Sequence, residues 1–297
     1  LVSAEEAAAL YDRMGPGREV SGGSAANTVA GVSALGGRAA FIGRVSDDQL
    51  GHVFAHDIRA AGVDFRTAAA SDGLPTAQCL ILVTPDAQRT MSTYLGSCQE
   101  LSVADIDEEM VRASAISYFE GYLWDRPGPM AAIGKAAAIA RASGRRTAMT
   151  LSDTFCVEGH RDDFLDLVAN RLDIVFANEN EARALFASDD LDVAVAGFAR
   201  HGLLAVITRS EKGAVVVRGD ERIAVPAAPA ARVLDTTGAG DLFAAGFLAG
   251  LSRGRPLREC AMMGTVAAAE IIEHYGARAE ADLVARMRDH GLDPGNR

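Results

Sequence analysis

A run of seven residues, D-T-T-G-A-G-D at positions 235–241, places small residues between two aspartates directly before an apolar stretch. The apolar stretch, 242–251, has the composition of a buried helix. Small residues leave the backbone N–H groups of a helix start unshielded, and these unpaired donors together with the positive end of the helix dipole favour an anion. The run therefore predicts a seat for a phosphate group.

Asp241 lies in the first turn of this predicted helix. A carboxylate beside a bound phosphate repels it unless the carboxylate has a purpose, such as accepting the proton of an attacking hydroxyl. The plainer interpretation is that Asp241 complements the helix dipole while the glycines shape a turn. The run by itself leaves both interpretations open.

A second glycine-rich run, S-G-G-S-A-A-N at 21–27, opens another predicted helix. Gly22 and Gly23 permit a ligand to approach the backbone closely, and Ser24 and Asn27 offer short polar groups suited to the hydroxyls of a small molecule. The alternative is a tight entry turn in which Ser24 caps the helix.

The run F-A-N-E-N-E-A at 176–182 passes from a predicted strand into a predicted helix. Asn178 and Glu181 there could orient a hydrated magnesium ion, which takes one or two carboxylates together with water and phosphate oxygens. An ordinary helix start with acidic residues in its first turn has the same appearance.

The elements that would position these residues follow an alternating pattern. Short apolar or β-branched runs at 39–43, 116–119, 147–151, 173–177 and 204–208 are separated by amphipathic segments. This alternation indicates βαβ units and a largely parallel sheet. Residues 77–95 break the pattern and predict a hairpin around a P-D-A-Q turn, which could project from the main sheet as a lid. We expect one domain, 1–297, that includes this hairpin.

Composition limits the possible partners. The chain has 297 residues, 49% of them hydrophobic, and a net charge of −11, so it lacks the basic footprint of a protein that binds nucleic acid or an anionic membrane. Its four cysteines form no C-x-x-C pair, which disfavours a disulfide framework or a thiolate zinc site. With no apolar run long enough for a membrane span and no signal-peptide pattern, we expect a reduced, cytoplasmic protein.

Several motifs of other enzyme classes are incomplete. The sequence has no G-x-x-x-x-G-K-[ST] phosphate loop, and its H-R-D at 160–162 lacks the other kinase motifs. His52 and His56 have the spacing of zinc ligands but no accompanying glutamate or third ligand. A dinucleotide fingerprint starting at Gly238 fails at Phe243.

Taken together, G-G-S-A-A-N at 22–27, N-x-x-E at 178–181 and D-T-T-G-A-G-D at 235–241 resemble the signatures of the ribokinase-like (PfkB) family of carbohydrate and nucleoside kinases. The resemblance extends over about 3–283. It implies a three-layer α/β/α sandwich with a mostly parallel central sheet and a small β lid, and an ATP-dependent transfer of phosphate to a small molecule. Within the family, the sequences of two segments, 21–37 and Y-F-E-G-Y-L-W-D at 118–125, are most similar to adenosine kinase-like members.

The resemblance also implies roles for the residues on the acceptor side. Asp241 would be the catalytic base that takes the proton from a hydroxymethyl group. The anion hole would be formed by Gly238, Ala239 and Gly240. The hydroxyls of a ribose or sugar would be held by Gly22, Gly23, Ser24 and Asn27.

On the nucleotide side, the resemblance implies that Asn178 and Glu181 organise magnesium and the phosphates. The ATP site would be lined by Thr208, Ser210 and Gly213, with Arg89 of the hairpin supplying positive charge when the lid closes. A monovalent cation such as potassium would bind at Asp235 and Thr237.

Some expectations remain open at this point. Family members usually begin with a strand that bears an aspartate for binding the hydroxyls of the acceptor. We expect about 30 residues, this strand among them, to be missing before Leu1. The acceptor is adenosine or a related nucleoside in one interpretation, with Phe119, Tyr122, Trp124 and Phe155 available for a base-stacking slot, and a sugar in another. A non-catalytic ligand sensor is a third alternative, and the hairpin could serve as a homodimer interface.

Overall fold

The computed structural model describes residues 1–295 and contains a six-stranded sheet of order β10-β9-β8-β7-β6-β5. Four of its strands are parallel: β5 (Ile116–Glu120), β6 (Arg146–Thr150), β7 (Ile174–Asn178) and β8 (Leu204–Thr208). The other two, β9 (Ala214–Arg218) and β10 (Glu221–Val225), run antiparallel to their neighbours. The predicted strands at 116–119, 147–151, 173–177 and 204–208 are therefore all present.

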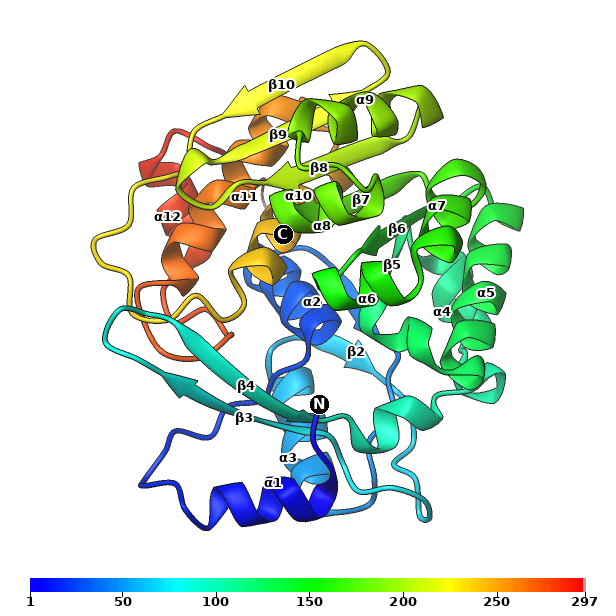
Figure 1. Ribbon diagram of the computed structural model, residues 1–297, viewed down its shortest axis with the longest axis vertical. Coiled ribbons are helices and arrows are strands. Elements are labelled where there is room, and N and C mark those ends of the chain that lie inside the picture. Colours follow the sequence, from blue (N-terminus) through cyan, green and yellow to red (C-terminus); the bar gives the residue numbers. More distant parts are fainter. Residues whose placement is uncertain (296–297) are drawn as a thin grey trace.

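Helices cover both faces of this sheet, as Figure 1 shows. Alternate strand residues point to opposite sides, so that Val175 and Ala205 pack in one core while Ile174 and Val206 pack in the other. The first core is completed by α5 (Pro127–Ala142), α6 (Thr154–Gly159), α7 (Arg161–Asn170), α8 (Glu179–Leu185) and α9 (Leu191–His201). The second is completed by α2 (Ser24–Ala34), α10 (Ala239–Ser252) and α11 (Leu257–Ile271), with α12 (Leu283–Asp289) packed behind α11.

The expectation that 39–43 joins the main sheet is wrong. β1 (Ala39–Phe41) instead pairs in parallel with β2 (Val63–Phe65), and β5 has β6 as its strand neighbour within the described residues. The pair is held by its own small core, in which Phe41 and Phe65 contact Phe54 of α3 (Gln49–Ala60) with ring centroids less than 6 Å apart. This local aromatic packing stabilises the β1–β2 unit separately from the six-stranded sheet.

The predicted hairpin is present as β3 (Gln78–Val83) and β4 (Arg89–Tyr94), paired antiparallel from Gln78↔Tyr94 to Val83↔Arg89. It lies apart from the main sheet, beside α1 (Ala4–Tyr11), in the lower part of Figure 1. Its role as a lid and the description of the chain as one domain remain predictions. The remaining short elements are η1 (Gly96–Glu100), η2 (Val103–Asp105), α4 (Glu108–Ala113), η3 (Gly121–Asp125) and η4 (Ser210–Lys212).

Close helix packing brings the two glycine-rich runs together. A Cβ atom at Gly31 of α2 would lie 2.6 Å from Cβ of Ala245 in α10, and one at Gly246 of α10 would lie 2.4 Å from the Met263 carbonyl oxygen in α11. Only glycine permits these approaches. α2 is thereby packed closely against α10, and α10 against α11.

Helix boundaries follow local signals in most places. Ser3 and Glu6 form the capping box of α1, and the H-R-D run is an ordinary helix start at α7. α11 ends at Ile271, and Glu273 and His274, which follow it, belong to a polar network described below. Within residues 1–295, none of the helices combines the length and apolar character that a membrane crossing requires.

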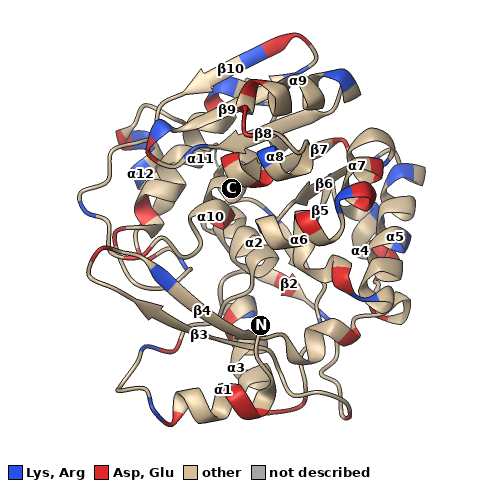
Figure 2. Ribbon diagram, in the orientation of Figure 1, with Lys and Arg blue, Asp and Glu red and all other residues tan. Residues whose placement is uncertain are grey.

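Charge is distributed over many elements. Figure 2 shows Lys and Arg interspersed with Asp and Glu on both helical layers rather than gathered on one element. This distribution agrees with the net charge of −11 and requires that a phosphate ligand be held by local donors.

Candidate active site

The carboxylate of Asp241 is held by two side chains from α2. Ser24 Oγ donates to Asp241 Oδ1 at 2.7 Å, and Asn27 Nδ2 donates to Oδ2 at 2.8 Å. Thr28 Oγ1 also donates to the backbone oxygen of Asp241 at 3.2 Å. The structure thus brings together the two runs that the sequence marked separately, and fixes the orientation of the carboxylate.

The start of α10 is open where the phosphate seat is predicted. Gly238 has φ 80°, a left-handed conformation that favours glycine, and a Cβ atom there would lie 2.9 Å from Cβ of Ala277. A Cβ atom at Gly240 would meet no atom within 4 Å. Within residues 1–295 the N–H groups of Gly240 and Asp241 have no hydrogen-bond acceptor. These two donors at a helix start are suited to an anion.

The turn before α2 is also accessible. Gly23 is the N-cap residue with φ 95°, and its carbonyl accepts from Asn27 N at 2.7 Å. A Cβ atom at Gly22 would find open space within 4 Å. Ser24 does not cap its own helix, because its hydroxyl is directed to Asp241 instead. Ser24 is therefore not the cap of α2, although the run does form the turn that enters the helix.

Glu120 is a neighbour of Asp241 that the sequence interpretation missed. It ends β5, and its Oε2 accepts from Ala25 N, in the first turn of α2, at 2.9 Å. Burial raises the pKa of Glu120, the hydrogen bond from Ala25 lowers it, and the charge of Asp241 raises it further. Its place at the carboxyl end of a predicted parallel strand was the only sequence signal for it.

Arg278, in the loop between α11 and α12, is a second residue that the sequence interpretation missed, and it had no sequence signal. Its Nε donates to the Ser21 carbonyl at 3.1 Å and its Nη1 to the Ala26 carbonyl at 2.8 Å. Burial lowers the pKa of its guanidinium to about 10, while the charges of Asp241 and Asp57 raise it. The side chain is therefore still cationic near neutral pH.

The pKa of Asp241 reflects opposing influences. Burial raises it, and the hydrogen bonds from Asn27 and Ser24, followed by the charges of Arg278 and Arg89, lower it; burial dominates. A carboxyl with a raised pKa is a stronger base once ionised, which suits a group that must take a proton from an alcohol.

Asn178 and Glu181 meet as the capping box of α8. Asn178 N and Nδ2 donate to the two oxygens of Glu181 at 2.9 and 2.5 Å, and Asn178 Oδ1 accepts from Glu181 N at 2.8 Å. Burial and then the charge of Asp153 raise the pKa of Glu181 to about 7, against the hydrogen bonds from Asn178.

The donor set around Glu181 suits one kind of metal ion. Groups of three or more His, Cys, Asp or Glu side chains that could enclose a metal are absent from the part of the chain that the structure describes. One carboxylate and one amide fit a magnesium ion held mainly through water and phosphate oxygens.

The residues predicted to line the ATP site lie at the ends of neighbouring strands. Thr208 ends β8 and is paired in register with Asn178 of β7. Ser210 begins the short helix η4, and Gly213 follows it with φ 81°, where a Cβ atom would lie 2.0 Å from the Val225 carbonyl oxygen. The carboxyl ends of these strands therefore bring Asn178, Thr208, Ser210 and Gly213 to one edge of the sheet, which is where ligands bind in open α/β sheets.

Asp235 and Thr237 are buried together beside the anion seat. Asp235 Oδ1 accepts from Thr237 N at 2.9 Å and from Thr237 Oγ1 at 2.6 Å, and Oδ2 accepts from Gly276 N at 3.1 Å. These bonds tie the loop after α11 to the start of α10. Binding of potassium or another monovalent cation here remains a prediction.

Arg89 is exposed at the start of β4, and its charge lowers the pKa of Asp241. Its predicted contact with the phosphates remains a prediction. Leu82 and Met91 of the hairpin are exposed on its opposite faces, and a groove of about 520 Å³ lies between residues 81–83 and 13–17. This groove does not include Asp241, and a homodimer formed through the hairpin also remains a prediction.

The four candidate aromatics divide into two groups. Trp124 and Phe119 pack in the core, with Trp124 against Phe164. Phe155 is 53% exposed, with its ring centroid 6.2 Å from that of Tyr122. Burial, and then the charges of Asp153, Cys156, Asp241 and Glu181, raise the pKa of Tyr122.

Comparison with known proteins agrees with this architecture. A crystal structure of adenosine kinase from Sinorhizobium meliloti is 52% identical, with a TM-score of 0.95 over 97% of this chain and 89% of that chain. A probable sugar kinase protein from Rhizobium etli CFN 42 is 48% identical, with a TM-score of 0.96 over 98% of this chain and 88% of that chain. A cytidine kinase from Thermococcus kodakarensis is 41% identical over 140 residues, which is 46% of this chain and half the length of that protein.

The fold and these neighbours define a ribokinase-like kinase, an α/β protein with a central, mostly parallel sheet. The sequence profile of the pfkB family carbohydrate kinases matches residues 7–283, and the chain belongs to that family. It is accordingly an ATP-dependent phosphotransferase that acts on a small molecule, a nucleoside or a sugar. The alternative of a non-catalytic sensor is not retained.

Proposed function

We propose that this kinase transfers the γ-phosphoryl group of ATP to the 5′-hydroxyl of adenosine, forming AMP and ADP. The observation that carries the proposal is the 52% identity to the Sinorhizobium meliloti adenosine kinase over 97% of this chain. The Tyr122–Phe155 pair supports it, because the Phe155 ring is 53% exposed and a purine ring needs an aromatic surface on which to stack.

In the proposed reaction, Asp241 accepts the proton of the acceptor hydroxyl as its oxygen attacks the γ-phosphorus. The bond between the γ-phosphorus and the bridging oxygen breaks, and ADP leaves with that electron pair. Ser24 and Asn27 hold the Asp241 carboxylate in one orientation during proton transfer. Phosphoryl transfer requires mainly positioning and charge stabilisation, which these contacts supply.

The N–H groups of Gly240 and Asp241 would donate to the oxygens of the migrating phosphoryl group. Each well-placed donor of this kind contributes about 3 kcal/mol to the stabilisation of a transition state. Asn178 and Glu181 would hold the water ligands of magnesium, which when bound neutralises charge on the ATP phosphates. The turn at Gly22 and Gly23 would place its backbone against the ribose hydroxyls.

A sugar acceptor is the second candidate, favoured by the 48% identity to the probable sugar kinase from Rhizobium etli. Ser24, Asn27 and Asp241 lie together and offer polar groups that would bind a hydroxymethyl group and the hydroxyls next to it. Riboses and hexoses share these groups. The acceptor-side polar contacts therefore serve either substrate class, and the base-stacking surface distinguishes them.

An ADP-release assay over adenosine, cytidine, guanosine, inosine, ribose and fructose tests the proposal. We expect the highest kcat/KM for adenosine, with AMP identified as the product by mass spectrometry. Phe155→Ala should raise the KM for adenosine more than the KM for a weak sugar acceptor, because only the nucleoside stacks on the ring. A sugar with the highest kcat/KM would replace the adenosine proposal with the second candidate.

A further inference from the structure

The loop between α11 and α12 contacts two segments: the 21–26 turn that enters α2, and the 235–238 segment that leads into α10. At its start, Gly276 N donates to Asp235 at 3.1 Å, next to the start of α10. Two residues later, Arg278 donates to the carbonyls of Ser21 and Ala26. Residues 276–278 therefore link the 21–26 turn to the segment before α10, and the proposed reaction requires a fixed position of these two segments relative to each other.

The two carbonyls held by Arg278 stand on either side of the glycine turn. Ser21 precedes Gly22 and Gly23, and Ala26 follows them, so the planar guanidinium spans the turn from end to end. Between these two carbonyls lies Ser24, and directly after them lies Asn27; both donate to Asp241. The turn that holds the base is thus the same turn that Arg278 holds.

Ser21 is also fixed from the side of α3. Its Oγ donates to Asp57 Oδ2 at 2.7 Å while its carbonyl accepts from Arg278. Arg278 Nη2 is buried and has no acceptor among residues 1–295, so part of the positive charge of the guanidinium is not paired by a direct hydrogen bond. The charges of Asp57 and Asp241 act on this guanidinium.

Other charged or titratable groups also face Asp241. Glu120 ends β5, Arg89 begins β4, and Tyr118 lies within β5. Of the two arginines, Arg89 is exposed on the hairpin, whereas Arg278 is half-buried and fixed by contacts to backbone carbonyls. Arg278 therefore supplies a constant positive charge near the base whatever the position of the hairpin.

We propose that Arg278 is a positioning residue for the acceptor half of the active site, which holds the 21–26 turn in its binding conformation and supplies a fixed positive charge there. This inference rests on the proposed function for its substrate, but its geometry does not depend on whether the acceptor is a nucleoside or a sugar.

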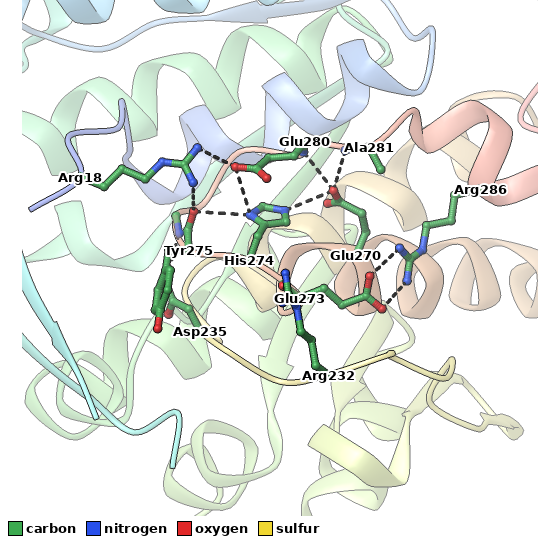
Figure 3. Close-up of polar contacts among 11 residues, drawn as sticks. Arg18, Arg232, Asp235, Glu270, Glu273, His274, Tyr275, Glu280, Ala281 and Arg286 are labelled. Carbon is green, nitrogen blue, oxygen red and sulfur yellow. Dashed lines mark hydrogen bonds and ion pairs between the residues drawn. The ribbon is translucent and has the colours of Figure 1, made fainter. Parts of the chain in front are cut away.

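The position of the loop is itself strongly determined. Glu270 is 1% exposed, and its Oε1 accepts from Glu280 N at 2.9 Å and Ala281 N at 2.8 Å, with His274 Nε2 3.2 Å away. Figure 3 shows the Glu270 carboxylate, at the end of α11, beside His274 and other residues of the loop that follows the helix. Arg18 closes the network from the segment that leads into the glycine turn, donating to Glu280 at 2.5 Å and to the Tyr275 carbonyl at 3.2 Å.

Three variants test the proposal on the full-length protein. Arg278→Met removes the charge and both carbonyl contacts, whereas Arg278→Lys retains the charge but cannot reproduce the planar two-armed contact. Arg253→Met is the matched control, because Arg253 also donates to two carbonyls, those of Ala249 and Leu35, at the far ends of α10 and α2. The measurements are KM for acceptor and for ATP, the pH profile of kcat/KM, and hydrogen exchange of peptides covering 18–30.

For Arg278→Met we expect kcat/KM for the acceptor to fall roughly 10- to 100-fold, the range for losing hydrogen bonds to a charged group, with little change in KM for ATP. The acidic limb of its pH profile should move to higher pH, because Asp241 loses a neighbouring positive charge. Arg278→Lys should raise the KM for the acceptor. The acidic limb of its kcat/KM profile should stay where it is in the wild type, because the positive charge is retained. In both Arg278 variants the backbone amides of 21–26 should exchange hydrogen faster than in the wild type. Arg253→Met should leave the KM values, the pH profile and this exchange rate unchanged.

Wild-type values of acceptor KM and of exchange over 21–26 in Arg278→Lys, or an unmoved acidic limb in a folded Arg278→Met, would overturn the proposal. If Arg278→Met does not fold, the lysine variant decides. If the wild-type enzyme phosphorylates a sugar instead, the same variants are assayed with that sugar, so that the substrate proposal fails without affecting this test. If no acceptor is turned over, exchange over 21–26 still distinguishes a held turn from a free one.

Discussion

Asn27 Nδ2 and Asp241 Oδ2 are 2.8 Å apart although 214 positions separate the two residues in the chain. Asn27 is 4% exposed, and its amide reaches the carboxylate because α2 packs directly on α10. The contact joins the proposed acceptor site to the proposed base.

Asp241→Asn removes the proposed proton acceptor while preserving the size of the side chain. We expect kcat to fall by roughly 10²- to 10⁴-fold, the usual contribution of a general base, with a modest change in nucleotide affinity. Steady-state kinetics with the best acceptor and calorimetric titration of ATP check these two quantities. Turnover near the wild-type rate would remove Asp241 from the role of base.

Asn27→Leu removes the amide donor with little change in volume. The hydrogen bond from Asn27 lowers the pKa of Asp241, so its loss should raise that pKa and shift the acidic limb of kcat/KM to higher pH. Ser24→Ala, which removes the other donor, should shift the limb in the same direction. An unmoved limb in both variants would mean that the protonation of Asp241 does not limit the reaction.

Arg89→Ala tests the hairpin charge separately from folding. We expect a higher KM for ATP or a lower kcat, and a small upward shift of the acidic limb because the Arg89 charge acts on Asp241. The melting temperature should stay close to wild type, since Arg89 is exposed. Kinetics identical to the parent enzyme would show that the hairpin charge has no part in turnover.

Glu181→Gln tests the magnesium assignment. The variant keeps an oxygen acceptor for Asn178 but removes the negative charge, so the magnesium concentration that gives half-maximal rate should rise, roughly 10- to 100-fold as for other groups that orient metal ligands. Adding EDTA should abolish the wild-type activity, and excess magnesium should restore it. A variant with the wild-type magnesium dependence would place the metal elsewhere.

The loop network predicts a pH-dependent contribution to stability. Arg286 donates to both oxygens of Glu273 at 2.9 Å, and this contact, with further donors, lowers the pKa of Glu273 to about 2. Since the carboxyl is more easily ionised in the folded state, its contribution is present above its ordinary pKa of 4.5 and is lost as pH falls toward 2.

Glu273→Gln should therefore lower the free energy of unfolding at pH 7 by about 1–3 kcal/mol, the range for hydrogen bonds to charged groups, and by less at pH 3. Urea denaturation at both pH values measures the difference. Glu221→Gln, which alters an exposed pair with Arg218, is the control and should have little effect at either pH. An equal loss at both pH values would contradict the ionic origin of this contribution.

The amino-acid sequence determined the features that depend on neighbouring residues: the four parallel strands, the hairpin at 77–95, the Ser3 and Asn178 helix starts, and the open helix start at 238–241. Each depends on periodicity, turn residues or backbone donors within a few positions, which can be read locally. The family signatures implied that Asp241 is the base, and this role stays a prediction.

Only the tertiary structure decided which residues surround Asp241. Glu120 has only its place at a strand end as a signal and Arg278 has none. They reach the site because that strand end and a loop converge on the start of α2. The placement of 39–43 outside the six-stranded sheet was likewise decided by packing against Phe54 and Phe65. Such contacts depend on close approach between distant segments, as at Gly31 and Ala245, and that approach is a property of the packed chain and not of any single stretch of it.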